Sequence, residues 1–172
     1  MSNIVSLSDA INPRQKYQAP FHYQAMNPNY LELINNKLER QHFMKHIGFD
    51  LTHIAPGYIE GFAPLTIDVQ QQDGFIHGGM TATVSDLVTG FAAFSLVNSE
   101  DRVVTSDLKV SYFSPGKGEG IFARGWVIKP GARLMYCEAE VYSVEQERHL
   151  LIAKAYAIMA VIKGKNKEIE GT

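Results

Sequence analysis

Several residue types are scarce in this sequence, and each shortage excludes a class of protein. The 172 residues hold only 1 cysteine, Cys137, so no internal disulfide can form. A lone thiol is typical of a reducing compartment, and we expect a cytoplasmic protein. No segment approaches the length of a membrane-spanning helix, about 18 uninterrupted apolar residues. The N-terminus also lacks the basic stretch and the apolar run of a signal peptide.

An excess of charge of either sign is also missing. Lys and Arg number 16 against 18 Asp and Glu, which gives a formal net charge of -2. No basic stripe is present, so nucleic acid is not an expected partner. The histidines do not follow a metal-ligand spacing, and Cys137 has no evident paired base. We therefore expect neither a metal nor a redox cofactor.

What the chain does contain is the composition of one globular domain, with 45% hydrophobic and 20% charged residues. This length and composition favour a single folded unit without a second domain. Residues 1–27 contain Pro13 and Pro20 and are interpreted as an extended N-terminal arm. The domain is expected to span residues 28–163, and residues 164–172 form a polar C-terminal tail.

The apolar pattern predicts helices and strands in a definite order. Residues 28–48 have a period near 3.6 and indicate one helix, and residues 49–65 indicate two short strands that turn at Pro56–Gly57. A polar loop follows over residues 66–76, and then a helix from about Gly79 to Val97. Four strands complete the domain, with turns at Pro130–Gly131 and around Glu145–Arg148. The prediction is an α+β domain whose antiparallel sheet wraps around the central helix.

The first of the four strands, over residues 102–115, alternates between apolar and polar side chains. One face is expected to carry the apolar residues Val104, Leu108, Val110 and Tyr112, and the other Thr105, Asp107 and Lys109.

The central helix carries two different rows of side chains. The apolar stripe consists of Met80, Val84, Leu87, Val88 and Phe91. The second row consists of Ala82, Asp86, Gly90 and Ala93, in which all but the aspartate are very small. Glycine inside a helix costs about 1 kcal/mol relative to alanine, so Gly90 needs a compensating role. The small row predicts a surface at which another backbone approaches closely.

Two features of this helix suggest acyl-transfer chemistry. His77-Gly78-Gly79 precedes the helix, where unpaired N–H groups and the helix dipole would receive an oxyanion and the glycines would admit a ligand closely. The alternative is a plain turn with a structural histidine. Asp86 lies too deep in the helix to cap it and could serve as a base or a nucleophile. The alternative is a solvated helix face.

Two polar side chains outside the helix complete the candidate site. The amide of Gln71 could donate to a carbonyl oxygen, and Gln70 or Gln72 could take that role instead. The hydroxyl of Thr105 could orient a water molecule. A solvated loop amide and an ordinary strand threonine are the alternatives.

The spacing of Gly78 and Asp86 carries a consequence for assembly. Eight residues of helix span about 12 Å along the axis, too far for both groups to reach one carbonyl carbon. If both act on one substrate, they come from different subunits. Two antiparallel copies of the helix would pair Gly78 of one with Asp86 of the other, which predicts a two-fold dimer with two equivalent sites.

Three segments together resemble a known family. They are "HGGMTATVSDLVTGFAA", "VVTSDLKVSYFSPGKGEGIFARGWVIKPGARLMYCEAEV" and "LIAKAYAIMAV". This combination resembles the hotdog-fold acyl-CoA thioesterases, and among them the phenylacetate-pathway thioesterase and its relatives, over roughly residues 48–163. The resemblance implies a hotdog fold, here with an extra N-terminal helix. It also implies a dimer with one continuous sheet, and often a tetramer made of two dimers.

The resemblance also implies roles for individual residues. Asp86 matches the catalytic carboxylate, as nucleophile or as base for a water. Gly78 matches the N–H that polarises the thioester carbonyl, with His77 shaping the turn. Gln71 and Thr105 match positions that hold the carbonyl and place the water. Many relatives have Asn and Ser at those two positions, so we expect activity with a shifted substrate.

Coenzyme A is expected as part of the substrate rather than as a cofactor. Its phosphates need cations, and the candidates are Lys117, Lys129 and Arg133, with ordinary solvated charges as the alternative. Gly79 would lie against the bound substrate. The acyl pocket could be lined by Met80, Val84, Phe91 and Met135, which core packing would explain equally well.

Two other functions are compatible with such a fold. One is hydration or dehydration of acyl thioesters, which needs a histidine and an acid at spacings this chain does not show. The other is a non-catalytic acyl-CoA or lipid-binding hotdog protein in which Asp86 is structural.

Overall fold

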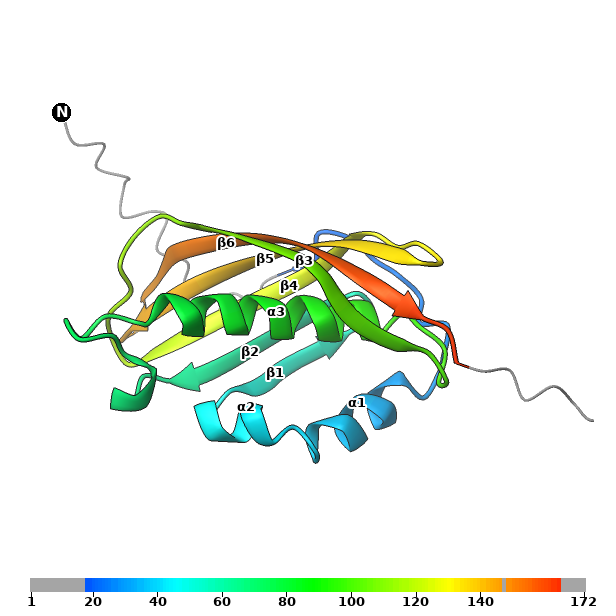
Figure 1. Ribbon diagram of the computed structural model, residues 1–172, viewed down its shortest axis with the longest axis horizontal. Coiled ribbons are helices and arrows are strands. Elements are labelled where there is room, and N and C mark those ends of the chain that lie inside the picture. The colour runs from blue at the N-terminus through cyan, green and yellow to red at the C-terminus, as the bar shows by residue number, and fades with distance from the viewer. Residues whose placement is uncertain (1–17, 147, 165–172) are drawn as a thin grey trace, which may run out of the picture.

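A computed structural model describes residues 18–146 and 148–164 of the chain (Figure 1). The elements in chain order are α1 (Tyr30–Leu38), α2 (His42–Ile47), β1 (Asp50–Ala55), β2 (Tyr58–Pro64), the short 3-10 helix η2 (Ile67–Val69), α3 (Gly78–Phe94), β3 (Arg102–Tyr112), β4 (Gly120–Lys129), β5 (Leu134–Glu145) and β6 (Arg148–Ile162). The predicted turns at Pro56–Gly57, Pro130–Gly131 and Glu145–Arg148 are confirmed. No helix within the described ranges is long and apolar enough to cross a membrane.

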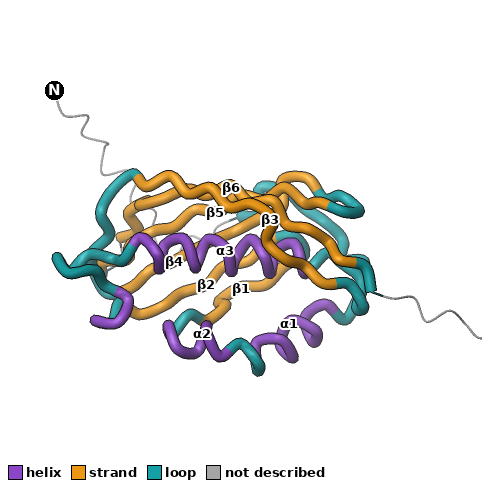
Figure 2. Tube along the Cα trace, in the orientation of Figure 1, coloured by secondary structure: helices purple, strands orange, loops and turns teal. Residues whose placement is uncertain are grey.

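The strands form one sheet that curls around α3. Their order is β1-β2-β4-β5-β6-β3, and every neighbouring pair is antiparallel. Figure 2 shows α3 lying along the sheet, with α1 and α2 beside the β1 end. A long helix enclosed by a curved antiparallel sheet is the hotdog arrangement, which confirms the predicted fold class. Strands β1 and β3 form the two edges of this sheet.

Small residues on α3 and on β4 let the helix pack closely on the sheet. Ser85 and Thr89 are buried in the helix, and their hydroxyls donate to the carbonyls of Thr81 and Ser85, one turn back, at 2.8 and 2.7 Å. Opposite them stands Gly125 of β4. A Cβ atom on Gly125 would lie 2.9 Å from the backbone nitrogen of Thr89. The sheet therefore contacts the helix backbone itself, over a row of hydroxyl residues.

The predicted single helix over residues 28–48 is wrong, because the segment forms two helices. The break is closed by short-range bonds, from the Arg40 N–H to the Lys37 carbonyl at 3.0 Å and from the Gln41 N–H to the Leu38 carbonyl at 3.1 Å. Ile34 and Met44 are both buried. On one continuous helix, residues ten positions apart would point about 80° away from each other. The break re-aims α2 so that both side chains reach the core.

The predicted alternation along β3 is also wrong, because the strand contains a β-bulge. The pairing of β3 with β6 shifts register between Thr105 and Asp107. Val103, Leu108 and Val110 pack against the core, whereas the Val104 side chain is 47% exposed. A bulge inserts one extra residue and so reverses which residues face inward. As a result, Thr105 faces α3 together with the inward residues that follow the bulge.

Candidate active site

The N-terminus of α3 is organised by His77. Its ring Nδ1 accepts a hydrogen bond from the Gly79 N–H at 2.9 Å, so His77 caps the helix. This bond occupies the Gly79 N–H. The Gly78 N–H, the first of the helix, donates to no partner within residues 18–146 and 148–164. Because Gly78 is exposed whereas Met80 is buried, the Gly78 N–H is an exposed donor without a partner in these ranges, at the positive end of the helix dipole.

Tyr112, at the end of β3, supports this same turn. Its hydroxyl donates to the Gly78 carbonyl at 2.9 Å, and its ring lies 3.6 Å from the place a Gly78 Cβ would occupy. The bond fixes the peptide that links Gly78 to Gly79. Tyr112 stood within the matched sequence segments, but no role was predicted for it, because the contact joins residues 34 positions apart.

Asp86 lies two turns further along α3 and meets Thr105 of β3. The Thr105 hydroxyl donates to Oδ1 of Asp86 at 2.5 Å and lies 3.6 Å from the sulfur of Met159. The other carboxylate oxygen, Oδ2, accepts no hydrogen bond from the described residues. Asp86 is half-buried. Thr105 therefore holds Oδ1, while Oδ2 remains open to a reactant. The Thr105 oxygen keeps acceptor capacity for a water molecule.

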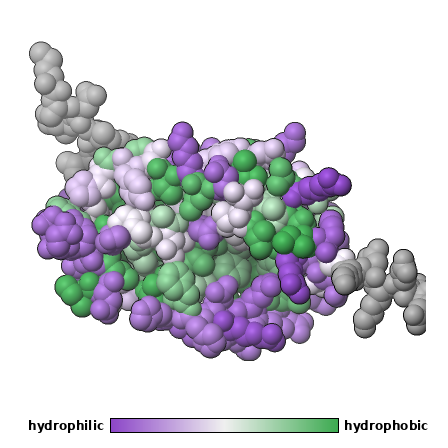
Figure 3. Space-filling view, viewed as in Figure 1, coloured by the Kyte–Doolittle hydropathy of each residue, from purple (hydrophilic) through white to green (hydrophobic). Residues whose placement is uncertain are grey.

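A cavity of about 290 Å³ opens at this pair. Its walls come from α1, α3, β3 and β6, and the residues are Lys37, Gln41, Asp86, Leu87, Gly90, Phe91, Phe94, Arg102, Val103, Val104, Thr105 and Met159. Figure 3 shows apolar side chains gathered over the middle of this face and hydrophilic ones along the side of α1 and α2. Of the predicted pocket residues, Phe91 lines this cavity, whereas Met80 and Val84 belong to the core and Met135 lines a separate cavity of about 370 Å³.

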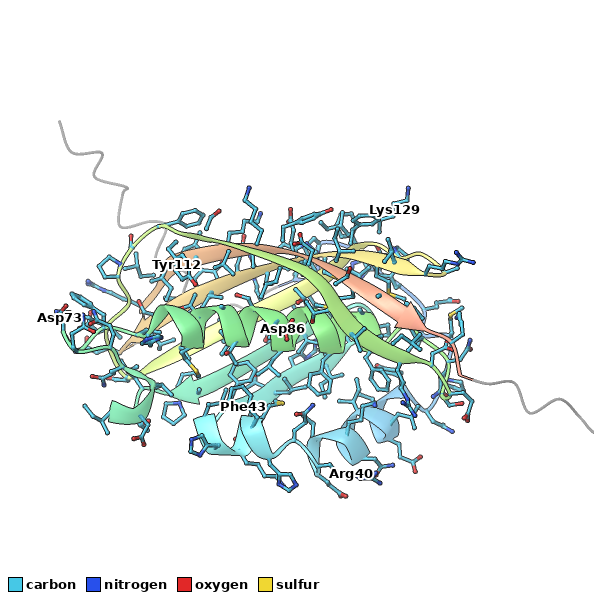
Figure 4. All side chains as sticks on the ribbon, in the orientation of Figure 1. Arg40, Phe43, Asp73, Asp86, Tyr112 and Lys129 are labelled. Atoms are coloured by element: carbon cyan, nitrogen blue, oxygen red, sulfur yellow. The ribbon has the colours of Figure 1, made fainter. Side chains whose placement is uncertain are left out.

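The remaining predicted site residues lie elsewhere. Gln71 is engaged in its own turn, where its Oε1 accepts from the Asp73 N–H at 2.7 Å. The Lys117 ammonium lies over the Phe75 ring, 4.3 Å from its centroid, near the start of α3. Lys129 ends β4 and Arg133 precedes β5, and Figure 4 shows Lys129 at the opposite end of the molecule from Asp73. The structure therefore does not bring these three cations together.

Gly78 and Asp86 do not lie together within one subunit either. Both belong to α3, and their separation is about 12 Å along the helix axis. Asp86 and the free N–H of Gly78 are thus two separate places on one subunit.

The described part of the chain offers neither a metal site nor a reactive thiol. No group of three or more His, Cys, Asp and Glu residues there could hold a metal ion. Cys137 is buried, and burial raises the pKa of its thiol to about 12. A thiol with that pKa carries almost no thiolate at neutral pH, so Cys137 is a packing residue.

Known proteins share both the sequence pattern and the fold. The sequence profile of the thioesterase superfamily matches residues 73–148. A thioesterase family protein of known structure from Silicibacter pomeroyi is 32% identical with a TM-score of 0.77, over 78% of this chain and 99% of that chain. The medium/long-chain acyl-CoA thioesterase YigI of Escherichia coli is 28% identical over 146 residues, 73% of this chain and 92% of YigI. The PaaI protein of the E. coli phenylacetic acid degradation operon shares the fold, with 18% identity and a TM-score of 0.71 over 79% of this chain and 95% of PaaI.

Proposed function

Because this chain belongs to the thioesterase superfamily and is a thioester hydrolase of that family, we propose that it cleaves acyl-CoA thioesters to a free acid and coenzyme A. The observation that carries the proposal is the Asp86–Thr105 pair in the wall of a cavity whose lining also includes the apolar side chains of Leu87, Phe91 and Phe94. A carboxylate with one oxygen held and one open suits attack on a carbonyl carbon. The apolar walls suit an aliphatic acyl chain, as in the named activity of YigI.

In the general-base route, Thr105 accepts a hydrogen bond from a water molecule, and Oδ2 of Asp86 removes its proton as the water oxygen attacks the thioester carbon. The C–S bond of the resulting tetrahedral intermediate then breaks. The sulfur leaves as the CoA thiolate and takes a proton from Asp86. In the nucleophilic route, Oδ2 attacks the thioester carbon and the C–S bond breaks, which leaves a mixed anhydride and the CoA thiolate. Water then attacks the Asp86 carboxyl carbon of the anhydride and releases the free acid, and the thiolate takes up the proton that the water loses. A single turnover in ¹⁸O-labelled water separates the routes, because only the second places ¹⁸O in Asp86.

The carbonyl oxygen needs a donor, and the Gly78 N–H is the free one. Since it lies about 12 Å from Asp86 in the same subunit, we propose a two-fold dimer in which the Gly78 N–H of the partner subunit faces Asp86. Strand β3 supports this assembly, because it is a sheet edge with Val104, Tyr112 and Phe113 exposed on or beside it. A second pairing of dimers into a tetramer is compatible with the same arrangement.

The activity test measures free CoA thiol released from acyl-CoAs of increasing chain length and from an aryl-CoA. Asp86→Asn should lower turnover by orders of magnitude without changing the folded spectrum. The matched control is Asp107→Asn, which removes an exposed carboxylate from the same region, outside the cavity. Equal turnover in Asp86→Asn and wild type would remove Asp86 from the mechanism. Binding of acyl-CoA without any turnover would instead indicate an acyl-CoA or lipid-binding protein.

The shared site has a sharper test by subunit mixing. Gly78→Pro removes only the N–H, since proline is favoured at the first helical position and His77 already has the extended conformation that precedes proline. Gly78→Pro and Asp86→Asn should each be inactive. Co-refolded, they should recover about a quarter of wild-type activity, because half of the dimers are mixed and each has one intact site. Sites contained within one subunit would give no recovery.

A further inference from the structure

The cavity at Asp86 continues along α3 as an open groove. Gly90 lies one turn beyond Asp86, and a Cβ atom built on it would have no neighbour within 4 Å. Phe94 lies one further turn along and also lines the cavity. From Asp86 to Phe94 the helix advances about 12 Å. An extended carbon chain advances about 1.2 Å per bond, as the polypeptide backbone does. An acyl chain of about ten bonds would therefore reach from Asp86 to Phe94.

Two cations stand at the far part of this groove. The Lys37 ammonium, from the last turn of α1, lies 4.5 Å from the centroid of the Phe94 ring. Arg102, the first residue of β3, lines the same cavity. No acidic side chain forms an ion pair with either residue in the described ranges. Two unpaired cations against the single carboxylate of Asp86 give the cavity a net positive charge.

This arrangement is unusual for a pocket that holds only a hydrocarbon chain. Helix α1 precedes the segment matched by the superfamily profile, which begins at residue 73. It nevertheless supplies a wall of the cavity and places a charge against an aromatic ring. Lys37 is an exposed residue, and its contact with the ring leaves the ammonium available to pair with an anion.

We infer that Lys37 and Arg102 form an anion subsite that holds a negatively charged group of the substrate, about 12 Å from the thioester carbon. This inference rests on the proposed thioesterase function. The charged group is a carboxylate at the far end of the acyl chain, because the groove that follows α3 from Asp86 matches about ten bonds of an extended chain. A carboxylate pairs with ammonium and guanidinium groups. The subsite selects the substrate and takes no part in bond cleavage.

The test compares three thioesters that share one acyl length of about ten carbons. The first is the straight-chain acyl-CoA, the second its ω-carboxy counterpart, and the third the straight-chain thioester of N-acetylcysteamine, which lacks phosphates. Steady-state kcat and KM are measured for wild type, Lys37→Gln and Arg102→Gln. The matched control is Arg40→Gln, which removes a positive charge just after α1, at a residue outside the cavity (Figure 4).

Each variant should raise KM about fivefold for the charged substrate, with kcat unchanged, as expected for loss of a partly exposed pair worth about 1 kcal/mol. A KM increase confined to the ω-carboxy substrate identifies the acyl end as the source of the anion. An increase shared by both CoA thioesters and absent from the N-acetylcysteamine thioester would identify the phosphates of coenzyme A as the anion and overturn the assignment to the acyl end. An increase of the same size in Arg40→Gln would mean general electrostatic attraction and would overturn the subsite.

The subsite and the proposed function can fail separately. KM values that do not change in Lys37→Gln and Arg102→Gln, with wild-type turnover intact, would overturn the anion subsite and leave the thioesterase function standing. Absence of wild-type turnover on all three thioesters, and on the broader acyl-CoA panel, would overturn the function and with it the inference that rests on it.

Discussion

The hydroxyl of Thr105 donates to Oδ1 of Asp86 across 2.5 Å and so joins the edge strand β3 to the middle of α3. The two residues are 19 positions apart, and the contact depends on the bulge that turns Thr105 inward. The bond holds a helix carboxylate in one orientation at the mouth of the cavity. Preorganisation of this kind lowers the cost of reaching the transition state.

Removing the hydroxyl of Thr105 should slow the reaction. Thr105→Val keeps the shape and loses the bond to Asp86, and a hydrogen bond to a charged group contributes about 1.5–3 kcal/mol. We expect kcat to fall about tenfold to a hundredfold. Thr105→Ser is the control, because it keeps the hydroxyl and should stay within severalfold of wild type. A valine variant as fast as the serine variant would contradict a role for this bond.

The turn at Gly78 gives a second prediction. Tyr112→Phe removes the donor to the Gly78 carbonyl while keeping the ring beside it. Loss of one neutral hydrogen bond corresponds to about 1 kcal/mol, so kcat/KM should fall about fivefold with little change in thermal stability. Tyr156→Phe changes a partly exposed tyrosine on β6 and is the matched control. Equal kinetics in the two variants would show that the turn holds its orientation without Tyr112.

The close contact between α3 and β4 predicts a large loss of stability. A Cβ on Gly125 would lie 2.7 Å from a Val88 methyl group and 2.8 Å from the Val88 carbonyl carbon. Backbone atoms cannot yield as a flexible side chain can, so Gly125→Val should cost at least about 2–3 kcal/mol. Thermal unfolding should show a fall of roughly 5–10 °C for a domain of this size.

Gly90 is the control for that measurement. Gly90→Ala meets open space and replaces a poor helix former, so it should be neutral or stabilising by up to about 1 kcal/mol. If Gly125→Val and Gly90→Ala changed stability equally, the close helix–sheet contact would be disproved.

The thiol of Cys137 should be inert in the folded protein. Burial raises its pKa to about 12, so at pH 8 only about one molecule in ten thousand carries the thiolate. An aromatic disulfide reagent should not react with native protein over the time of an assay and should react once in denaturant. Rapid labelling of native protein would show that this part of the sheet opens. The same reagent can then report CoA release without a protein background.

The sequence predicted the elements that depend on local patterns. Periodicity and turn residues predicted the two strands on either side of Pro56–Gly57, the long helix α3 that ends at Phe94, and the antiparallel order. The resemblance to hotdog thioesterases, carried by the segments around Asp86, is confirmed. The bulge beside Thr105 was not predictable, because the alternation of so few residues does not reveal one extra residue. It is visible only in the register shift of the pairing with β6, a strand that is distant in the sequence.

The site was predicted in part for the same reason. His77, Gly78 and Asp86 stand on one helix, and their spacing along it is fixed by sequence. Lys37 and Arg102 were not predicted to line the same cavity as Asp86. Helix α1 and the start of β3 meet only through tertiary packing, and a lysine in the last turn of a helix is otherwise an ordinary surface residue. The roles predicted for the site residues stay predictions, for Asp86, Gly78, His77, Gly79 and Thr105 as for Gln71, Lys117, Lys129 and Arg133.

The bulge divides β3 into two segments, and the inward side chains of the two segments contact different parts of α3. Thr105 before it serves the cavity, and Tyr112 after it braces the start of α3. Their common orientation depends on the number of residues between them rather than on the identity of those residues. Deleting Ser106 would remove the bulge and leave Thr105 and Tyr112 an even number of positions apart, so both would still face α3. Deleting any other residue between them, with the bulge kept, would turn one of the two outward. During divergence, this strand should therefore accept many replacements at its outward positions, yet tolerate a change in length only at the bulge itself.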